Sequence, residues 1–144
     1  MSSDLPVLLA AVSVLSGLHM GFQSRRVGWS RIKHKILQPS VVGPAEFERT
    51  FRAHQNGVEF YPIFLVLLWT SGIFCNEGLS AFGGLLYIVG REMYFTGYIS
   101  ETKKRLPGFY LGLFVILVLS VMASVGIIKS FLDKYLKIEM FERK

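Results

Sequence analysis

The stretch RLPGFYLGLFVILVLSVMASVGIIK, residues 105–129, holds 23 uncharged residues between Arg105 and Lys129. An apolar run of about 18 or more residues is long enough to cross a bilayer core as a helix. Uncharged runs of 20, 17 and 13 residues precede it, at 5–24, 60–76 and 78–90. This pattern excludes a soluble fold of this size, and with it intrinsic disorder and a nucleic-acid-binding module.

The composition of the whole chain agrees with a membrane protein. Its 144 residues are 51% hydrophobic and 18% charged, with a net charge of +6 and a mean hydropathy of +0.43. The length suits one domain, which we expect to span 1–144. A secretory signal begins with basic residues, but the one charged side chain before the first uncharged run is Asp4. We therefore expect this segment to be a retained helix rather than a secretory signal. The single cysteine, Cys75, allows no intrachain disulfide and indicates no oxidising compartment.

Turn and charge signals divide the chain into four predicted membrane helices. A basic segment with two prolines predicts a loop over 23–45, while 76–78 and 107–108 carry short turn signals. The predicted fold class is an all-α integral membrane protein, a four-transmembrane-helix bundle. The helices are expected at about 5–22, 46–75, 79–104 and 109–128. The tail, 129–144, is expected to continue the last helix or to lie on the membrane surface.

Basic residues predict the orientation of these helices. The loop after the first helix carries five Lys and Arg residues, and the segment after the third carries Lys103, Lys104 and Arg105. Because Lys and Arg accumulate in cytoplasmic loops, both segments are expected on the cytoplasmic side. The five basic residues of the tail oppose this orientation, although three acids accompany them.

Two polar stripes lie inside the predicted helices. At about 100° per residue, the members of each stripe fall within a sector of roughly 80°. Four cations face only two acids, so the stripes either form buried ion pairs or bind an anionic ligand. The stripes consist of Arg49, Arg52, Asn56 and Glu59 on the second helix and of Arg91, Tyr94, Tyr98, Glu101 and Arg105 on the third.

Glycines and histidines add two expectations. Gly83, Gly90 and Gly97 recur every seven residues beside the polar face of the third helix, which favours close packing between subunits. His54 projects from the opposite side of the second helix to Arg52, so a joint site would need two subunits. His19 and His34 have no acid at ligand spacing in the sequence and are interpreted as non-catalytic.

Several strings together resemble the membrane-associated proteins in eicosanoid and glutathione metabolism, the MAPEG family. The resemblance extends from LLAAV at 8–12 to FLD at 131–133, nearly the whole chain. Its most specific strings are EFER at 46–49, FRAHQN at 51–56, VEFYP at 58–62, YFTGY at 94–98 and KKR at 103–105.

The resemblance implies a homotrimer of four-helix subunits in endoplasmic reticulum membrane and nuclear envelope. It implies one glutathione between each pair of neighbours, near the cytoplasmic face, with His54 reaching the adjacent subunit's site. Arg105 is implied to activate the thiol, with Tyr98 as the second candidate, and no metal is implied. The implied glutathione contacts are Arg31, Arg52, His54, Asn56, Glu59, Tyr94, Tyr98 and Arg105.

The implied activity is transfer of glutathione to lipophilic electrophiles, including leukotriene A4 to give leukotriene C4, with possible peroxidase activity on lipid hydroperoxides. His54, Phe60 and Ile32 depart from the pattern of the leukotriene-forming members, which argues against dedicated leukotriene synthesis. The alternative is a non-catalytic lipid-binding scaffold resembling the five-lipoxygenase activating protein. That relative has Thr and Asp where this chain has Arg52 and Glu59, so the sequence favours the enzyme.

Overall fold

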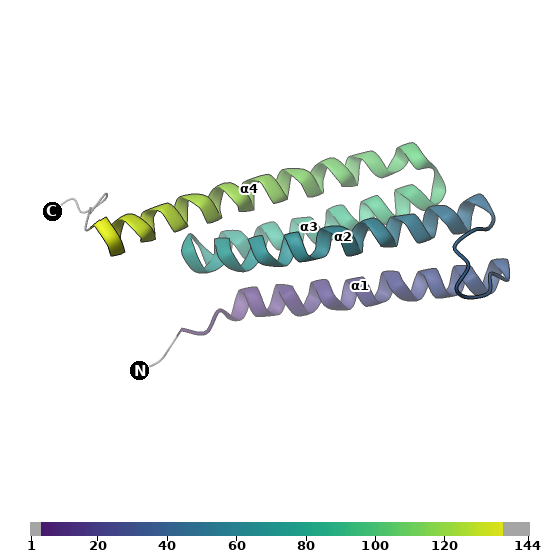
Figure 1. Cartoon of the computed structure of the whole chain (residues 1–144), viewed down its shortest axis with the longest axis horizontal. Helices are drawn as coiled ribbons and strands as arrows, with labels where there is room; N and C mark the ends of the chain where they lie inside the picture. Colours follow the sequence, from purple (N-terminus) through teal and green to yellow (C-terminus); the bar gives the residue numbers. More distant parts are fainter. Residues whose placement is uncertain (1–3, 137–144) are drawn as a thin grey trace.

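Four long helices lie side by side and alternate in direction (Figure 1). The structure is a computed structural model and describes residues 4–136. The helices are α1 (Val7–His34), α2 (Ala45–Phe74), α3 (Glu77–Ser100) and α4 (Leu106–Phe131). The α1–α2 loop and the α3–α4 connection lie at one end of the bundle, and the α2–α3 turn lies at the other. The two basic segments therefore share one end, as the sequence predicted.

Helix α1 is longer than expected, because residues 23–34 continue it and do not form a loop. Arg, Lys and Ser side chains on a solvated face leave the helical hydrogen bonds intact, and no proline occurs between Pro6 and Pro39. The helix ends where Lys35 adopts a left-handed conformation, with φ of 56°. The Ile36 N–H then donates to the Arg31 carbonyl at 2.9 Å, which satisfies a carbonyl of the last turn.

Helix α2 runs unbroken through Pro62 for 30 residues. The acids Glu46 and Glu48 stand in its first turn, where the helix dipole favours negative charge. Asn76 ends the following turn and starts α3, because its side-chain oxygen accepts from the Leu79 N–H at 2.8 Å.

The boundary between α3 and α4 differs from the prediction. Helix α3 stops at Ser100, and a 3-10 turn, η1 (Thr102–Arg105), carries Arg105 instead of the third helix. Helix α4 begins three residues before the expected 109, since Pro107 lies in its first turn, where a missing N–H breaks no helical bond. The tail continues α4 through η2 (Leu132–Leu136), and its remainder, 137–144, lies outside the described residues.

Three of the four expected membrane spans meet the length and composition of a membrane helix within the described residues: α1, α2 and the segment Thr102–Leu136. Helix α3 does not meet this criterion, and it holds the charged residues Arg91 and Glu92. It packs against each of the other three helices, so much of its polar surface faces protein. Large apolar side chains are exposed along the bundle, as a lipid-facing surface requires.

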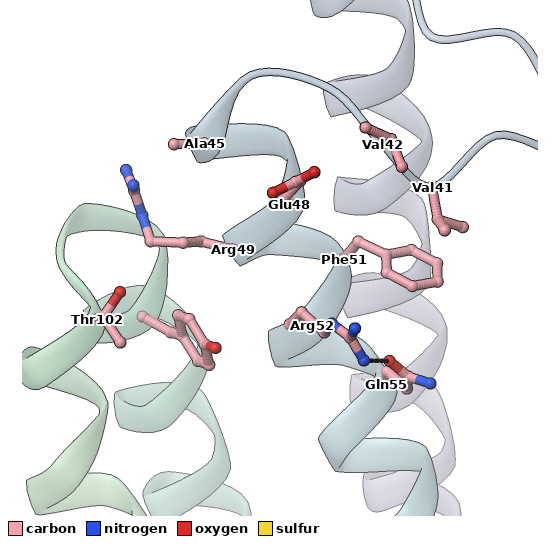
Figure 2. Close-up of a pocket in the computed structure, with 10 residues that line it drawn as sticks. Val41, Val42, Ala45, Glu48, Arg49, Phe51, Arg52, Gln55 and Thr102 are labelled. Atoms are coloured by element: carbon pink, nitrogen blue, oxygen red, sulfur yellow. Dashed lines mark hydrogen bonds between the residues drawn. The ribbon is translucent and has the colours of Figure 1, made fainter.

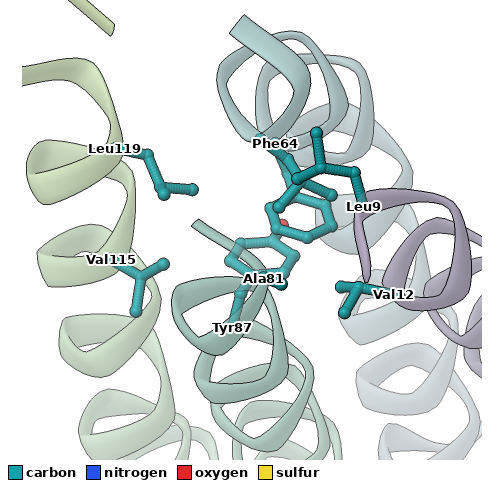
Figure 3. Close-up of a cluster of buried hydrophobic side chains, with 8 residues drawn as sticks. Leu9, Val12, Phe64, Ala81, Tyr87, Val115 and Leu119 are labelled. Atoms are coloured by element: carbon teal, nitrogen blue, oxygen red, sulfur yellow. The ribbon is translucent and has the colours of Figure 1, made fainter. Parts of the chain in front are cut away.

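The apolar core lies between the helices (Figure 3). Its residues from α1 and α2 belong to the half of the bundle away from the basic end. The rings of Phe64 on α2 and Tyr87 on α3 stack with centroids 4.0 Å apart. Leu9 and Val12 of α1 close one side of this stack, and α4 closes the other. A smaller cluster of Ala53, Tyr94 and Phe95 lies nearer the basic end.

The glycine stripe of α3 faces α4 within the same chain, which contradicts its predicted role between subunits. A Cβ at Gly90 would lie 3.3 Å from the carbonyl oxygen of Gly108, and one at Gly83 would lie 3.3 Å from Leu119. A Cβ at Gly97 would meet the backbone of Lys104 in η1. Seven-residue spacing indicates a close helix contact, and only the tertiary structure shows that α4 is the partner.

Candidate functional site

A pocket of about 580 Å³ opens at the basic end of the bundle (Figure 2). The first three turns of α2 form one wall, Thr102 lies on the opposite one, and the α1–α2 loop lies across the top. Tyr98 of α3 also lines the pocket. Its lining consists of Val41, Val42, Ala45, Glu48, Arg49, Phe51, Arg52, Gln55, Tyr98 and Thr102.

Two guanidinium groups give the pocket its positive charge. Arg49 Nε donates to the Ile99 carbonyl at 3.0 Å, and the exposed Arg52 donates from Nη1 to Gln55 Oε1 at 2.9 Å. Glu48 Oε1 accepts from the Gly43 N–H at 3.3 Å. Within residues 4–136, no carboxylate lies within 4.0 Å of either arginine's nitrogens. Each cation thus retains donors for an anionic group.

Arg105 and Tyr98 lie together at the edge of this pocket. The Arg105 guanidinium carbon is 5.3 Å from the centre of the Tyr98 ring, and its Nη1 donates to the Thr102 carbonyl at 2.6 Å. Tyr98 in turn meets the ring of Tyr94 edge-on, with centroids 5.6 Å apart. The 3-10 turn, and not helical periodicity, brings Arg105 beside the tyrosine.

A second polar group lies deeper, between α2 and α3. Arg91 is 6% exposed and donates from Nη1 to Asn56 Oδ1 at 2.9 Å and from Nη2 to the Ala53 carbonyl at 3.4 Å. Its guanidinium also lies over the Tyr94 ring, 4.3 Å from the centroid. Arg91 therefore anchors Asn56 and Tyr94, two of the residues that the sequence predicted as contacts.

The other predicted residues stand outside the pocket lining. Glu59 is exposed on α2, and His54 is half-buried on the same helix. Arg31 lies in the last turn of α1, donates to the Ser40 carbonyl at 2.6 Å and packs over Phe47. Within this single chain, the pocket brings Arg52 and Tyr98 together and leaves Arg31 and His54 apart.

Sequence reasoning missed several features of this end of the bundle. Gln55, Phe51 and Thr102 line the pocket but were not predicted to do so. The sequence held one signal for them: Gln55 follows Arg52 by three residues, which places the two on the same face of a helix. His19 Nε2 lies 2.7 Å from Glu92 Oε2, although 73 residues separate them in sequence. Within the described ranges, no group of three His, Cys, Asp or Glu side chains could hold a metal ion.

The fold, with its cationic pocket at the loop end of an apolar four-helix bundle, agrees with the family model that matches residues 7–125, described as the MAPEG family. The chain belongs to the MAPEG family.

Individual relatives agree with this membership. Microsomal glutathione S-transferase 2 of Homo sapiens is 45% identical over 137 residues, 95% of this chain and 93% of the relative. The Mus musculus protein of the same name is 50% identical over 129 residues, 90% of this chain and 88% of the relative. Leukotriene C4 synthase of Bos taurus is 37% identical over 134 residues, 93% of this chain and 89% of the relative.

Proposed function

We propose that this protein is a membrane-bound glutathione transferase. The pocket that holds Arg49 and Arg52, neither paired with a carboxylate among the described residues, carries the proposal. Glutathione has two carboxylates that guanidinium groups bind through charge-assisted hydrogen bonds. The names of the relatives, microsomal glutathione S-transferase 2 and leukotriene C4 synthase, support the same substrate.

The proposed contacts extend from the pocket to residues of α2 and α3 farther from the loop end. Arg52 binds a glutathione carboxylate, and the exposed Glu59 pairs with the ammonium group. Asn56 and Tyr94, both held by Arg91, bind the peptide part of the molecule. Tyr98 and Arg105 face the sulfur.

A second copy of the chain completes the site in this proposal. Arg31 and His54 lie outside the pocket of their own chain. The expected homotrimer places one glutathione between each pair of neighbours, where Arg31 and His54 of one subunit reach the pocket of the next. Crosslinking of the detergent-purified protein would test the trimer.

The proposed chemistry depends on ionising the glutathione thiol. A thiol has an ordinary pKa of about 8.5, so a few per cent is thiolate at neutral pH unless a cation stabilises it. The Arg105 guanidinium supplies that cation, with the Tyr98 hydroxyl as the second candidate. The thiolate forms a C–S bond to an electrophilic carbon. With an epoxide the C–O bond breaks and the oxygen takes up a proton.

Peroxidase activity follows from the same thiolate. Attack on the terminal oxygen of a lipid hydroperoxide breaks the O–O bond, releases the lipid alcohol after protonation and oxidises the sulfur to a sulfenic acid. A second glutathione then condenses with it to give glutathione disulfide and water. Both reactions use electrophiles dissolved in the bilayer, and the exposed apolar surface of the helices allows such molecules to approach.

We further propose that the protein is a multi-pass resident of endoplasmic reticulum membrane and nuclear envelope, with its pocket toward the cytoplasm. The basic α1–α2 loop and the basic η1 turn lie at the pocket end of the bundle, which the preference of Lys and Arg for cytoplasmic loops supports. Soluble glutathione would then reach the site directly.

A lipid-binding scaffold without catalysis is the second candidate, and a specific feature favours it. A wholly apolar groove of about 260 Å³ lies between α3 and α4, lined by residues such as Phe82, Leu86 and Phe114. Its apolar lining suits an acyl chain. A scaffold would bind lipid there and turn over no glutathione.

One experiment separates the two candidates. The purified protein in detergent is incubated with glutathione and, in separate reactions, with leukotriene A4, a dinitrophenyl halide or a lipid hydroperoxide. A transferase gives conjugate with at least one of the first two electrophiles, above the uncatalysed rate. Lipid binding without conjugate or glutathione disulfide would establish the scaffold instead.

A further inference from the structure

Three buried polar atoms at the junction of α1 and α3 have no hydrogen-bond partner within residues 4–136. They are Gln23 Oε1, Tyr87 Oη and Arg91 Nε. The three side chains are 1%, 4% and 6% exposed. A buried donor or acceptor that stays unpaired is destabilising, so native proteins pair nearly all such atoms with protein or ordered water.

Tyr87 and Arg91 line a small cavity, and Gln23 lies next to Gly57, another residue of its lining. The cavity is lined by residues of α1, α2 and α3, including Tyr61, Tyr87 and Arg91, and measures about 10 Å³, the size that holds a single water molecule. Gly57 of α2 keeps the space open, because a Cβ there would lie 3.2 Å from Arg91 Nη2 and 3.7 Å from Gln23 Oε1. Both side chains therefore approach Gly57, which itself lines the cavity.

The three atoms have the chemistry that one water molecule requires. Arg91 Nε donates, Gln23 Oε1 accepts, and the Tyr87 hydroxyl does either. Gln23 Nε2 donates to the Arg91 carbonyl at 3.4 Å, which leaves Oε1 as the acceptor of this side chain. Three hydrogen bonds are the usual number for a buried water.

We propose that this cavity binds one ordered water molecule, held by Gln23, Tyr87 and Arg91. The water completes the hydrogen bonding of the Arg91 guanidinium, whose Nη1 holds Asn56 at 2.9 Å. Gln23 is thereby a positioning residue that acts on Asn56 through the water and Arg91. This second step rests on the proposed role of Asn56 in glutathione binding, whereas the water site does not.

The water site is tested by an experimental structure of the full chain at a resolution that shows ordered waters. Density is expected between the three side chains in the native protein, and it is expected to be lost in Gly57→Ala, whose methyl group occupies the space. A dry cavity in the native protein, while other buried waters are visible, would overturn the proposal. Undiminished density in Gly57→Ala would overturn it as well.

The positioning role is tested by kinetics with Gln23→Met, which removes both the Oε1 acceptor and the Nε2 donor at nearly constant volume. The KM for glutathione should rise about 2- to 12-fold, the value of one hydrogen bond, with kcat little changed. Gln23→Glu keeps an acceptor oxygen and should restore the KM. Ser80→Ala is the matched control, because Ser80 is fully buried and bonds Ser71 away from the cavity.

The outcomes keep the two proposals apart. An unchanged KM in a folded Gln23→Met variant would overturn the positioning role, and so would a KM that Gln23→Glu fails to restore. Native protein that turns over no glutathione would refute the proposed function, while the density at the cavity would still decide the water site. Thermal unfolding of each variant in detergent verifies that the chain is folded.

Discussion

Replacing Arg52 with alanine separates glutathione binding from folding better than any other substitution in the pocket. The Arg52 side chain is exposed and makes one hydrogen bond, to Gln55 at 2.9 Å on its own helix. Arg49, its neighbour in the pocket, instead ties α2 to the Ile99 carbonyl at the end of α3. Among the described residues, loss of Arg52 therefore breaks no hydrogen bond or ion pair between helices.

The expected magnitudes differ for the two properties. An exposed side chain with one local hydrogen bond contributes within about 0.5 kcal/mol to stability, so Arg52→Ala should leave thermal unfolding nearly unchanged. One charge-assisted hydrogen bond to a carboxylate contributes about 1.5 to 3 kcal/mol to binding. The Kd for glutathione should accordingly rise about 10- to 150-fold.

The assay is isothermal titration of glutathione into the detergent-purified protein, alongside steady-state KM values. Arg25→Ala is the matched control, because Arg25 is another exposed arginine that packs over Trp29 on α1, outside the pocket. Its Kd should equal that of the native protein. A folded Arg52→Ala variant with native affinity would refute the assignment and leave the cationic pocket without its proposed ligand.

Three further substitutions test the thiol chemistry, the packing and the orientation. Arg105→Ala should lower kcat at least about tenfold more than it weakens glutathione binding, and should move the absorbance titration of the bound thiolate to higher pH, since the cation that lowers the thiol pKa is gone. An unshifted titration would transfer the role to another group. Gly108→Ala should destabilise the fold by about 1 to 3 kcal/mol, because its Cβ would meet the Tyr94 backbone nitrogen and lie 2.5 Å from the Gly90 carbonyl oxygen. Gly21→Ala is the control and should leave the stability unchanged, because a Cβ at this position meets nothing within 4 Å. Equal melting curves for the Gly108→Ala and Gly21→Ala variants would contradict the close α3–α4 packing. In sealed microsomes, an impermeant thiol reagent should label a cysteine introduced by Leu37→Cys on the α1–α2 loop without permeabilisation. The exposed native Cys75 should be labelled only after permeabilisation. The reverse result would show that the orientation is opposite to the one proposed.

The membrane character of the chain could be predicted from sequence because hydrophobicity is local information. A run of 23 uncharged residues needs no tertiary partner to favour a bilayer. Helix ends were less predictable. Arg and Lys residues between 23 and 34 suggested a loop, but such residues do not break a helix and α1 continues through them. Pro107 suggested a break between two helices, but it lies in the first turn of α4.

By itself, the sequence determined the four helices, the shared end of the basic segments and the family, since each rests on local composition or on strings of residues at fixed spacing. Only the tertiary structure decided which side chains meet. The glycines of α3 approach α4 of the same chain, and Arg105 reaches Tyr98 from a 3-10 turn. Arg91 holds Asn56 across 35 residues of sequence. Periodicity assigns a residue to a face of its helix, but the partner of that face depends on how the other helices pack around it, which no local pattern records.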